Sequence, residues 1–329
     1  MNIHLTSPLD MHLHLREDEI LSLVTPLSAH SFCGGVIMPN LIDPVDTKRK
    51  LLAYREKIID ASHSDTFTPF MTLFFKPFSR EELESVRDDI IGIKLYPAGI
   101  TTQSENGVTD FNDIMATLEA MEELEIPLLV HGESGGFVMD REKEFCFVYR
   151  DLAQRFPKLH IIMEHITTRN AVDLLEEYEN LSATITLHHL LITLDDVAGG
   201  MLEPDLFCKP IAKTPDDREA LREVVFGGHP RIMFGSDSAP HPRHKKECVG
   251  CAAGIFSSPV ALPLLAQVFE EAECLDKLQG FISDIACRRY GLVPPEKNIT
   301  LTRKAWRVPE RYGSIRPFYA GKEIRWSLV

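Results

Sequence analysis

Short apolar runs alternate with longer amphipathic segments along most of the chain. The apolar runs have four to seven residues, the length of a buried strand. We expect strands at residues 7–13, 35–38, 70–75, 91–96, 127–131, 160–165, 182–186 and 231–235. Apolar residues at helical spacing, with charged faces, predict helices that include residues 46–61, 110–125, 141–156 and 168–180. Eight strand–helix alternations predict a (β/α)8 TIM barrel, which is an α/β fold.

A doubly wound open sheet is the alternative fold for this alternation. Its usual nucleotide site needs a G-x-G-x-x-G turn after the first strand, and none follows here. From about residue 290 the pattern changes to Pro and Gly punctuation around short β-like pieces. We therefore predict a single barrel domain over residues 1–329, in which residues 290–329 form a C-terminal extension packed on the barrel.

Composition and charge exclude several classes of protein. The 329 residues are 44% hydrophobic and carry a formal net charge of −14, with a pI near 5.4. Nucleic acids and anionic membranes are bound through clustered positive charge, so neither partner is expected. The sequence shows no leader-like N-terminus and no apolar run of roughly 18 residues, which predicts a soluble, cytoplasmic protein. Seven scattered cysteines favour reduced thiols over a disulfide framework.

Side chains that can bind metal ions fall near the carboxyl ends of the predicted strands. His12 and His14 are two residues apart, so both imidazoles face the same side of their strand. Other strands end near Lys94, His131, His165 and Asp237. The carboxyl ends of barrel strands meet at one mouth, so these six side chains should converge there. Four imidazoles and a carboxylate suit zinc or a similar divalent ion.

The same residues lie in motifs that resemble a known family. The motifs are DMHLHLRE, VIMPNL, GIKLYPAGITT, LLVHGE, MEHITT, FGSDSAPHPRHKKE and GCAAG, and they cover roughly residues 10 to 256. They resemble the cyclic amidohydrolases of the amidohydrolase superfamily, and most closely the short, single-domain bacterial dihydroorotases. Only eleven residues precede His12, where many cyclic amidohydrolases carry a β-rich segment. This argues against a hydantoinase or an allantoinase.

The resemblance implies a metal-dependent hydrolase with two metal ions. His12 and His14 would bind one zinc ion, and His131 and His165 would bind the second. Asp237 would be a ligand of the first ion and also the catalytic acid and base. A hydroxide held between the two ions would attack a ring amide carbonyl, and Asp237 would transfer its proton to the departing ring nitrogen.

Lys94 is an unusual residue for a predicted buried strand. An unpaired ammonium is costly to bury, and Lys94 lies inside the apolar segment IGIKLY. The resemblance implies that Lys94 is carboxylated on Nζ and bridges both metal ions. Burial and nearby cations would lower its pKa and expose a neutral amine, which can capture carbon dioxide. The alternative is an ammonium that reaches solvent at the strand end and carries no carbamate.

Further positions match substrate contacts of the family. Arg16, Asn40 and His241 would hold the substrate carboxylate. Other implied contacts are His131 and Ala253. Lys209 matches a ring contact that the family usually makes through the backbone, at a position where it more often has an apolar residue. Thr101 and Thr102 match the paired threonines of a loop, residues 98–110, which we expect to close over the substrate as a lid.

The implied function is zinc-dependent, reversible interconversion of L-dihydroorotate and N-carbamoyl-L-aspartate in de novo pyrimidine (UMP) biosynthesis. Alternatives are another cyclic amidohydrolase, a mononuclear deaminase, in which a bridging Lys94 has no use, and an inactive dihydroorotase-like protein that binds a partner enzyme. The native metal, the dominant reaction direction and the oligomeric state are left open, and a homodimer is one candidate.

The sequence leaves open the roles of two other groups of residues. His188 and His189 follow the strand at residues 182–186, where a structural role is favoured over one in lining the pocket. Cys248 and Cys251 have zinc-knuckle spacing, but no matching second pair follows, so a turn with two reduced thiols is favoured.

Overall fold

The barrel is formed by eight parallel strands that make one continuous sheet. The computed structural model describes residues 1–63 and 66–329. The strands are β2 (Leu9–Leu13), β3 (Gly34–Ile37), β4 (Thr68–Phe74), β5 (Gly92–Leu95), β6 (Leu128–Val130), β7 (Ile161–Met163), β8 (Leu181–Ile185) and β9 (Ile232–Phe234), which are neighbours in this order. A parallel bridge between Leu13 of β2 and Ser238, four residues after β9, joins the end of the sheet to its first strand. The predicted barrel is confirmed, and every predicted strand lies within two residues of an observed one.

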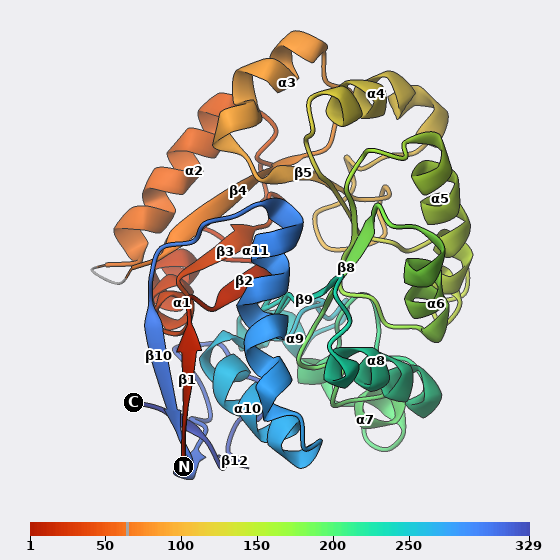
Figure 1. The fold of residues 1–329 in the computed structure, drawn as a ribbon. Helices are drawn as coiled ribbons and strands as arrows, with labels where there is room; N and C mark the ends of the chain where they lie inside the picture. Colours follow the sequence, from red (N-terminus) through yellow and green to blue (C-terminus); the bar gives the residue numbers. More distant parts are fainter. Residues whose placement is uncertain (64–65) are drawn as a thin grey trace.

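Helices surround the barrel, as Figure 1 shows. They are α1 (Asp18–Ser31), α2 (Lys48–Ala61), α3 (Arg80–Val86), α4 (Met115–Glu123), α5 (Arg141–Arg155), α6 (Arg169–Glu177), α7 (Leu194–Ala198), α8 (Pro215–Gly227), α9 (Arg243–Lys246), α10 (Ala261–Glu271) and α11 (Ile285–Tyr290). The four predicted helices are confirmed, although residues 111–114 form a 3-10 turn before α4. Within the described ranges, no helix has the length and apolar character needed to cross a membrane.

Local sequence signals explain where the helices begin and end. In α8, the Thr214 side chain caps the helix by accepting a hydrogen bond from the Asp217 amide, and Pro215 occupies the first turn. Gly228 ends α8 in a left-handed conformation with φ of 76°, which glycine adopts without a steric penalty.

The interior of the barrel is filled by apolar side chains from the strands. One buried cluster contains Leu9, Met11, Val36, Leu129, Ile162 and Met233, from β2, β3, β6, β7 and β9. A much larger cluster packs the outer faces of the strands against the helices. The packed interior leaves the polar side chains at the carboxyl ends of the strands, where a barrel presents its functional groups.

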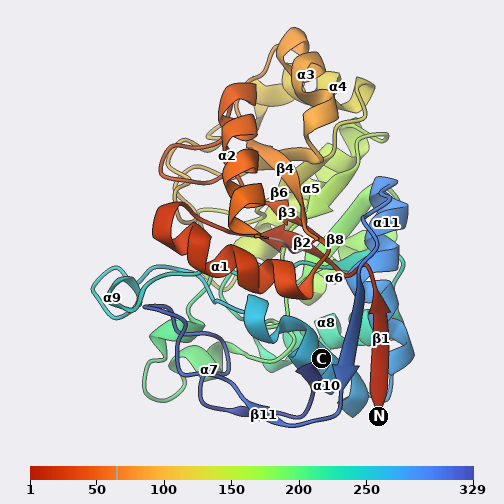
Figure 2. The ribbon, with the colours of Figure 1, turned by 90° about the vertical axis from the view of Figure 1, so that its left-hand side faces the viewer.

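The two ends of the chain pair with each other outside the barrel. β1 (Asn2–Thr6) runs antiparallel to β10 (Asn298–Thr302), which also pairs with β13 (Ser327–Leu328). Figure 2 shows β1 and β10 side by side. β11 (Trp306–Arg307) pairs with β12 (Glu323–Ile324). Trp326 is fully buried, and its Nε1 donates to Glu270 of α10 at 3.1 Å, which anchors the C-terminal segment on a barrel helix.

Candidate metal and substrate site

Four histidines and one aspartate converge at the mouth of the barrel. Nε2 of His14 lies 3.0 Å from Oδ1 of Asp237, and Nε2 of His12 lies 3.5 Å from the same oxygen. Nδ1 of His131 lies 3.2 Å from Nε2 of His165. The ring centroids of His12 and His165 are 4.8 Å apart, which joins the two groups. All five side chains are buried.

The backbone around these residues adopts conformations that are unusual for residues with a side chain. Asp237 has φ of 43° and His165 has φ of 41°. Such left-handed conformations cost roughly 1–3 kcal/mol each and cluster at functional sites. Asp10 holds the turn before Asp237, because it accepts hydrogen bonds from the amide and hydroxyl of Ser236 at 2.8 and 2.5 Å. At Gly235 an added β-carbon would lie only 2.9 Å from the β-carbon of His12, which is too close for a residue with a side chain to fit.

Lys94 lies in β5 and has an exposed fraction of 0%. Its Nζ has no hydrogen-bond partner in the described part of the chain. Burial lowers the pKa of Lys94 to about 8, although the carboxylates of Glu164 and Asp237 act in the opposite direction. A substantial fraction of this amine is therefore neutral near physiological pH. An unpartnered, buried and partly neutral amine fits a lysine that carries an additional polar group.

Two buried glutamates orient the histidines, and neither was predicted from the sequence. Nδ1 of His12 lies 2.7 Å from Oε2 of Glu164, and Nε2 of His131 lies 2.7 Å from Oε2 of Glu133. Each contact leaves the other ring nitrogen free to face the mouth, as is usual for metal-binding histidines. Glu133 follows its partner His131 by two residues, whereas Glu164 is 152 residues from its partner His12, so local spacing gives no signal for that contact.

The electrostatics of the mouth favour the protonation states that bind metal ions. Burial, followed by the charge of Arg16, lowers the pKa of His14 to about 3, and burial also lowers the pKa of His131 and His165. Burial alone would raise the pKa of Asp237, but its hydrogen bond with His14 and the other nearby imidazoles hold that pKa well below the usual value. Neutral imidazoles and an ionised carboxylate fit a site for divalent metal ions.

A cavity beside this cluster brings the predicted metal and substrate residues together. It is lined by His12, His14, Arg16, Asn40, Tyr96, Thr101, Thr102, His131, His165, Lys209, Asp237, Ala239, Ala253 and Gly254. All predicted site residues except Lys94 and His241 are in this lining. Thr101, Thr102, Lys209 and Ala253 also line an outer cavity of about 790 Å³.

Arg16 and His241 are neighbours on one side of the cavity. Nη2 of Arg16 lies 3.1 Å from Nε2 of His241, which lies 3.0 Å from the carbonyl oxygen of Ala253. Burial, followed by the charge of Arg16, lowers the pKa of His241 to about 3, so the imidazole is neutral. The Tyr54 hydroxyl donates to the carbonyl of Arg16 at 2.7 Å and supports its backbone, which has φ of 60°.

The predicted lid, residues 98–110, is fastened to the rest of the cavity by two side chains. Asn40 Nδ2 donates to the carbonyl of Thr102 at 3.1 Å, and Lys209 Nζ donates to the carbonyl of Ile100 at 2.6 Å. Both residues were predicted as substrate contacts. The resemblance gave the side chain of Lys209 no task of its own, whereas here it holds the loop.

The two groups left open by the sequence lie outside the lining of the cavity beside the histidine cluster, although Cys251 lines the outer cavity. His188 and His189 are buried next to Cys208. Cys248 is exposed and Cys251 is half-buried. All seven cysteines belong to the described part of the chain and are free thiols.

Comparisons with known proteins place these features in a family context. No family model matches the sequence. Dihydroorotase from Helicobacter hepaticus is 44% identical over 335 residues, which cover 99% of this chain and 97% of that protein. The crystal structure of dihydroorotase from Campylobacter jejuni matches with a TM-score of 0.96 and 52% identity, covering 99% of this chain and 97% of that one. Dihydroorotase from Saccharomyces cerevisiae, in complex with 5-fluoroorotic acid, matches with a TM-score of 0.93 and 35% identity, covering 100% of this chain and 98% of that one.

Proposed function

The chain belongs to the dihydroorotase family, and we propose that it interconverts L-dihydroorotate and N-carbamoyl-L-aspartate with two divalent metal ions at the barrel mouth. Dihydroorotases are metal-dependent cyclic amidohydrolases of pyrimidine biosynthesis. The observation that carries the proposal is the convergence of His12, His14 and Asp237 with His131 and His165 beside one cavity.

The proposed ligand sets follow the two groups of side chains. His12, His14 and Asp237 offer ligand atoms within 4.8 Å of one another and would hold one ion. His131 and His165 would hold the other. We propose Zn²⁺ because imidazole and carboxylate donors suit it. When bound, such ions lower the pKa of water and polarise a carbonyl as Lewis acids.

Lys94 is proposed to carry a carbamate that bridges the two ions. Its neutral amine attacks carbon dioxide, a nitrogen–carbon bond forms, and one proton leaves the nitrogen for solvent. The pKa of about 8 and the unpartnered Nζ support this modification. The carbamate replaces a buried cation with an anion, which suits a neighbourhood of metal ions.

Asp237 is proposed to move the proton during the reaction. In the hydrolytic direction a carbon–oxygen bond forms at the ring carbonyl and the ring carbon–nitrogen bond breaks. Asp237 accepts the proton of the attacking water and gives it to the departing nitrogen. Its low pKa supports an ionised carboxylate that is ready to act as the base.

Arg16, Asn40 and His241 are proposed to bind the exocyclic carboxylate of the substrate. Arginine can hold a carboxylate through two parallel hydrogen bonds. The yeast relative was solved with 5-fluoroorotic acid, a pyrimidine carboxylate, which supports this class of ligand. Thr101 and Thr102 of the lid, with Ala253 and Lys209, would enclose the ring.

A cytoplasmic location is part of the proposal, and the seven free thiols support a reducing compartment. Cell fractionation tests it. The homodimer and the single-domain organisation stay predictions, which light scattering and limited proteolysis can test.

The decisive assay measures conversion of dihydroorotate and carbamoyl aspartate by the purified protein, before and after metal removal. We expect activity that a chelator abolishes and Zn²⁺ restores. Turnover of another cyclic amide without turnover of dihydroorotate would indicate a different amidohydrolase. A protein with full metal content and no turnover would indicate an inactive relative.

A further inference from the structure

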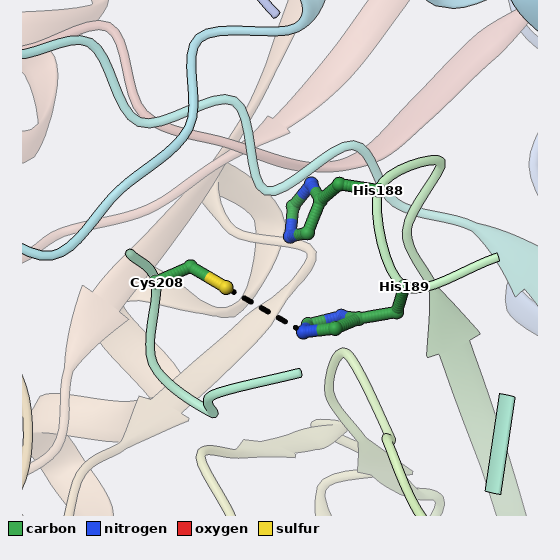
Figure 3. A group of neighbouring side chains, drawn as sticks. All are labelled: His188, His189 and Cys208. Carbon is green, nitrogen blue, oxygen red and sulfur yellow. Dashed lines mark hydrogen bonds between the residues drawn. The ribbon is translucent and has the colours of Figure 1, made fainter. Parts of the chain in front are cut away.

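A second group of side chains with metal-binding atoms lies outside the catalytic cavity lining (Figure 3). His188, His189 and Cys208 each offer one ligand atom, and these atoms lie within 4.8 Å of one another. The histidines follow β8, and Cys208 lies between β8 and α8. The exposed fractions are 0%, 2% and 0%. None of the three belongs to the proposed two-metal centre.

His188 gives independent evidence that something is bound here. Neither of its ring nitrogens has a hydrogen-bond partner among the described residues, and the side chain is fully buried. Burying a polar group without a partner is costly, and native structures rarely tolerate it. Figure 3 shows the ring of His188 directed toward the space between Cys208 and His189. A ligand in that space would supply the missing partner.

The distances within the cluster suit a tetrahedral metal ion. Sγ of Cys208 lies 3.6 Å from Nε2 of His189. Two ligand atoms at usual Zn–S and Zn–N distances, about 2.3 and 2.1 Å, would lie about 3.6 Å apart in a tetrahedral site. The carbonyl oxygen of Pro210 lies 3.0 Å from Nε2 of His189 and 3.2 Å from Sγ of Cys208. It provides a fourth donor atom.

Hydrogen bonds alone satisfy the polar atoms of only two of the three side chains, His189 and Cys208. Nδ1 of His189 lies 2.9 Å from Oγ1 of Thr186, and its Nε2 reaches the Pro210 carbonyl. The Cys208 thiol can donate to the same carbonyl. His188 remains unpaired in this arrangement, so a buried water molecule would be required beside it.

We propose that His188, His189 and Cys208 form a third metal site that holds a Zn²⁺ ion. Two imidazoles and one thiolate are a ligand set that zinc favours. On binding, a zinc–sulfur bond forms and the thiol proton of Cys208 leaves for solvent. The ring proton of His189 moves to Nδ1, where Oγ1 of Thr186 can accept it.

The ion would have a structural role next to the catalytic cavity. It would join the segment after β8 to the segment that contains Lys209, whose Nζ holds the lid at Ile100. The third site would thereby fix the position of the residue that fastens the lid. This inference stands on the cluster itself and does not depend on the proposed reaction.

The test is the metal content and the cobalt spectrum of the full-length protein. After removal of loosely bound metal, we expect three zinc ions per chain. The proposed two-metal centre contains no sulfur ligand, so a thiolate-to-metal charge-transfer band in Co²⁺-loaded protein reports on the third site. Cys208→Ala should remove this band and one ion per chain, and His188→Gln should weaken binding of that ion. Cys33→Ala, which removes another fully buried thiol, should keep both the charge-transfer band and the third ion.

Two zinc ions per chain and no charge-transfer band in the unsubstituted protein would overturn the proposal and assign a buried water to His188. The metal content and the Co²⁺ spectrum of the unsubstituted protein test the proposal even if Cys208→Ala does not fold. Turnover of dihydroorotate with two ions and no charge-transfer band would leave the proposed function intact and refute the third site alone.

Discussion

Nδ1 of His12 lies 2.7 Å from Oε2 of Glu164, so one buried carboxylate fixes which nitrogen of His12 faces the barrel mouth. The same oxygen accepts a hydrogen bond from the Thr184 hydroxyl at 2.6 Å. The glutamate is thereby fixed to β8, and it connects the first barrel strand with two later ones. A carboxylate in this position sets the tautomer of a metal-binding histidine and raises its basicity.

Glu164→Gln should weaken metal binding while the barrel stays folded. The amide keeps the shape but removes the charge, and loss of such a partner costs about 10- to 100-fold in metal affinity. Competition with a chelator measures the effect. Glu176→Gln, at a mostly exposed glutamate that contacts His229, should leave the affinity unchanged. Equal affinities in both variants would show that Glu164 does not support a ligand.

Lys94→Ala should lose bound metal and most of the activity, because the proposed bridging carbamate cannot form. Intact mass spectrometry under native conditions should find the mass of one added carbon dioxide on the unsubstituted chain and not on the variant. Lys304→Ala, at an exposed lysine, is the control. A Lys94→Ala protein with full metal content and normal turnover would contradict the carbamate.

Recovery of the metal-free protein should depend on pH. Carbon dioxide reacts with the neutral amine, and the pKa of Lys94 is lowered to about 8 by burial. Below this pKa the ammonium predominates, so the rate of reactivation with Zn²⁺, measured at one fixed concentration of dissolved carbon dioxide, should rise as pH increases toward about 8 and then level off. Initial reactivation rates, assayed after return to one common pH, measure this. A rate that falls with rising pH would be inconsistent with capture by Lys94.

Arg16→Lys should mainly raise KM for dihydroorotate. Lysine keeps the charge but cannot form two parallel hydrogen bonds with a carboxylate. Loss of one hydrogen bond to a charged group corresponds to roughly a 10- to 100-fold effect on kcat/KM. Arg243→Lys, at an exposed arginine paired with Glu247, should behave like the unsubstituted protein. A change in kcat alone would place Arg16 outside carboxylate binding.

Lys209→Met should loosen the lid without affecting the metal ions. Methionine keeps much of the apolar stem and removes the 2.6 Å hydrogen bond to Ile100. We expect KM to rise about 3- to 10-fold, the effect of one ordinary hydrogen bond, with unchanged metal content. Lys322→Met, at a lysine on the C-terminal segment, is the control. Loss of metal together with activity would show that Lys209 acts beyond the lid.

The sequence predicts the barrel and its mouth well because both depend on local patterns. Each apolar run marks a strand, and each polar residue at its end marks the rim, so His131 and His165 could be expected near each other. Glu133 and Glu164 could not be singled out, since a carboxylate next to a histidine has no distinctive spacing. The contact of Lys209 with Ile100 spans 109 residues and depends on the path of two loops. β1 escaped detection because only one of its five residues is buried.

The antiparallel pair of β1 and β10 also constrains how the protein is made. β1 leaves the ribosome well before its partner, residues 298–302, because almost 300 residues separate the two strands. Throughout synthesis the edge of β1 therefore has no native strand beside it, and such an edge can pair with other chains. β10 thus covers one edge of β1, and a chain that terminates before residue 298 would carry the eight barrel strands with this edge of β1 uncovered and prone to aggregation.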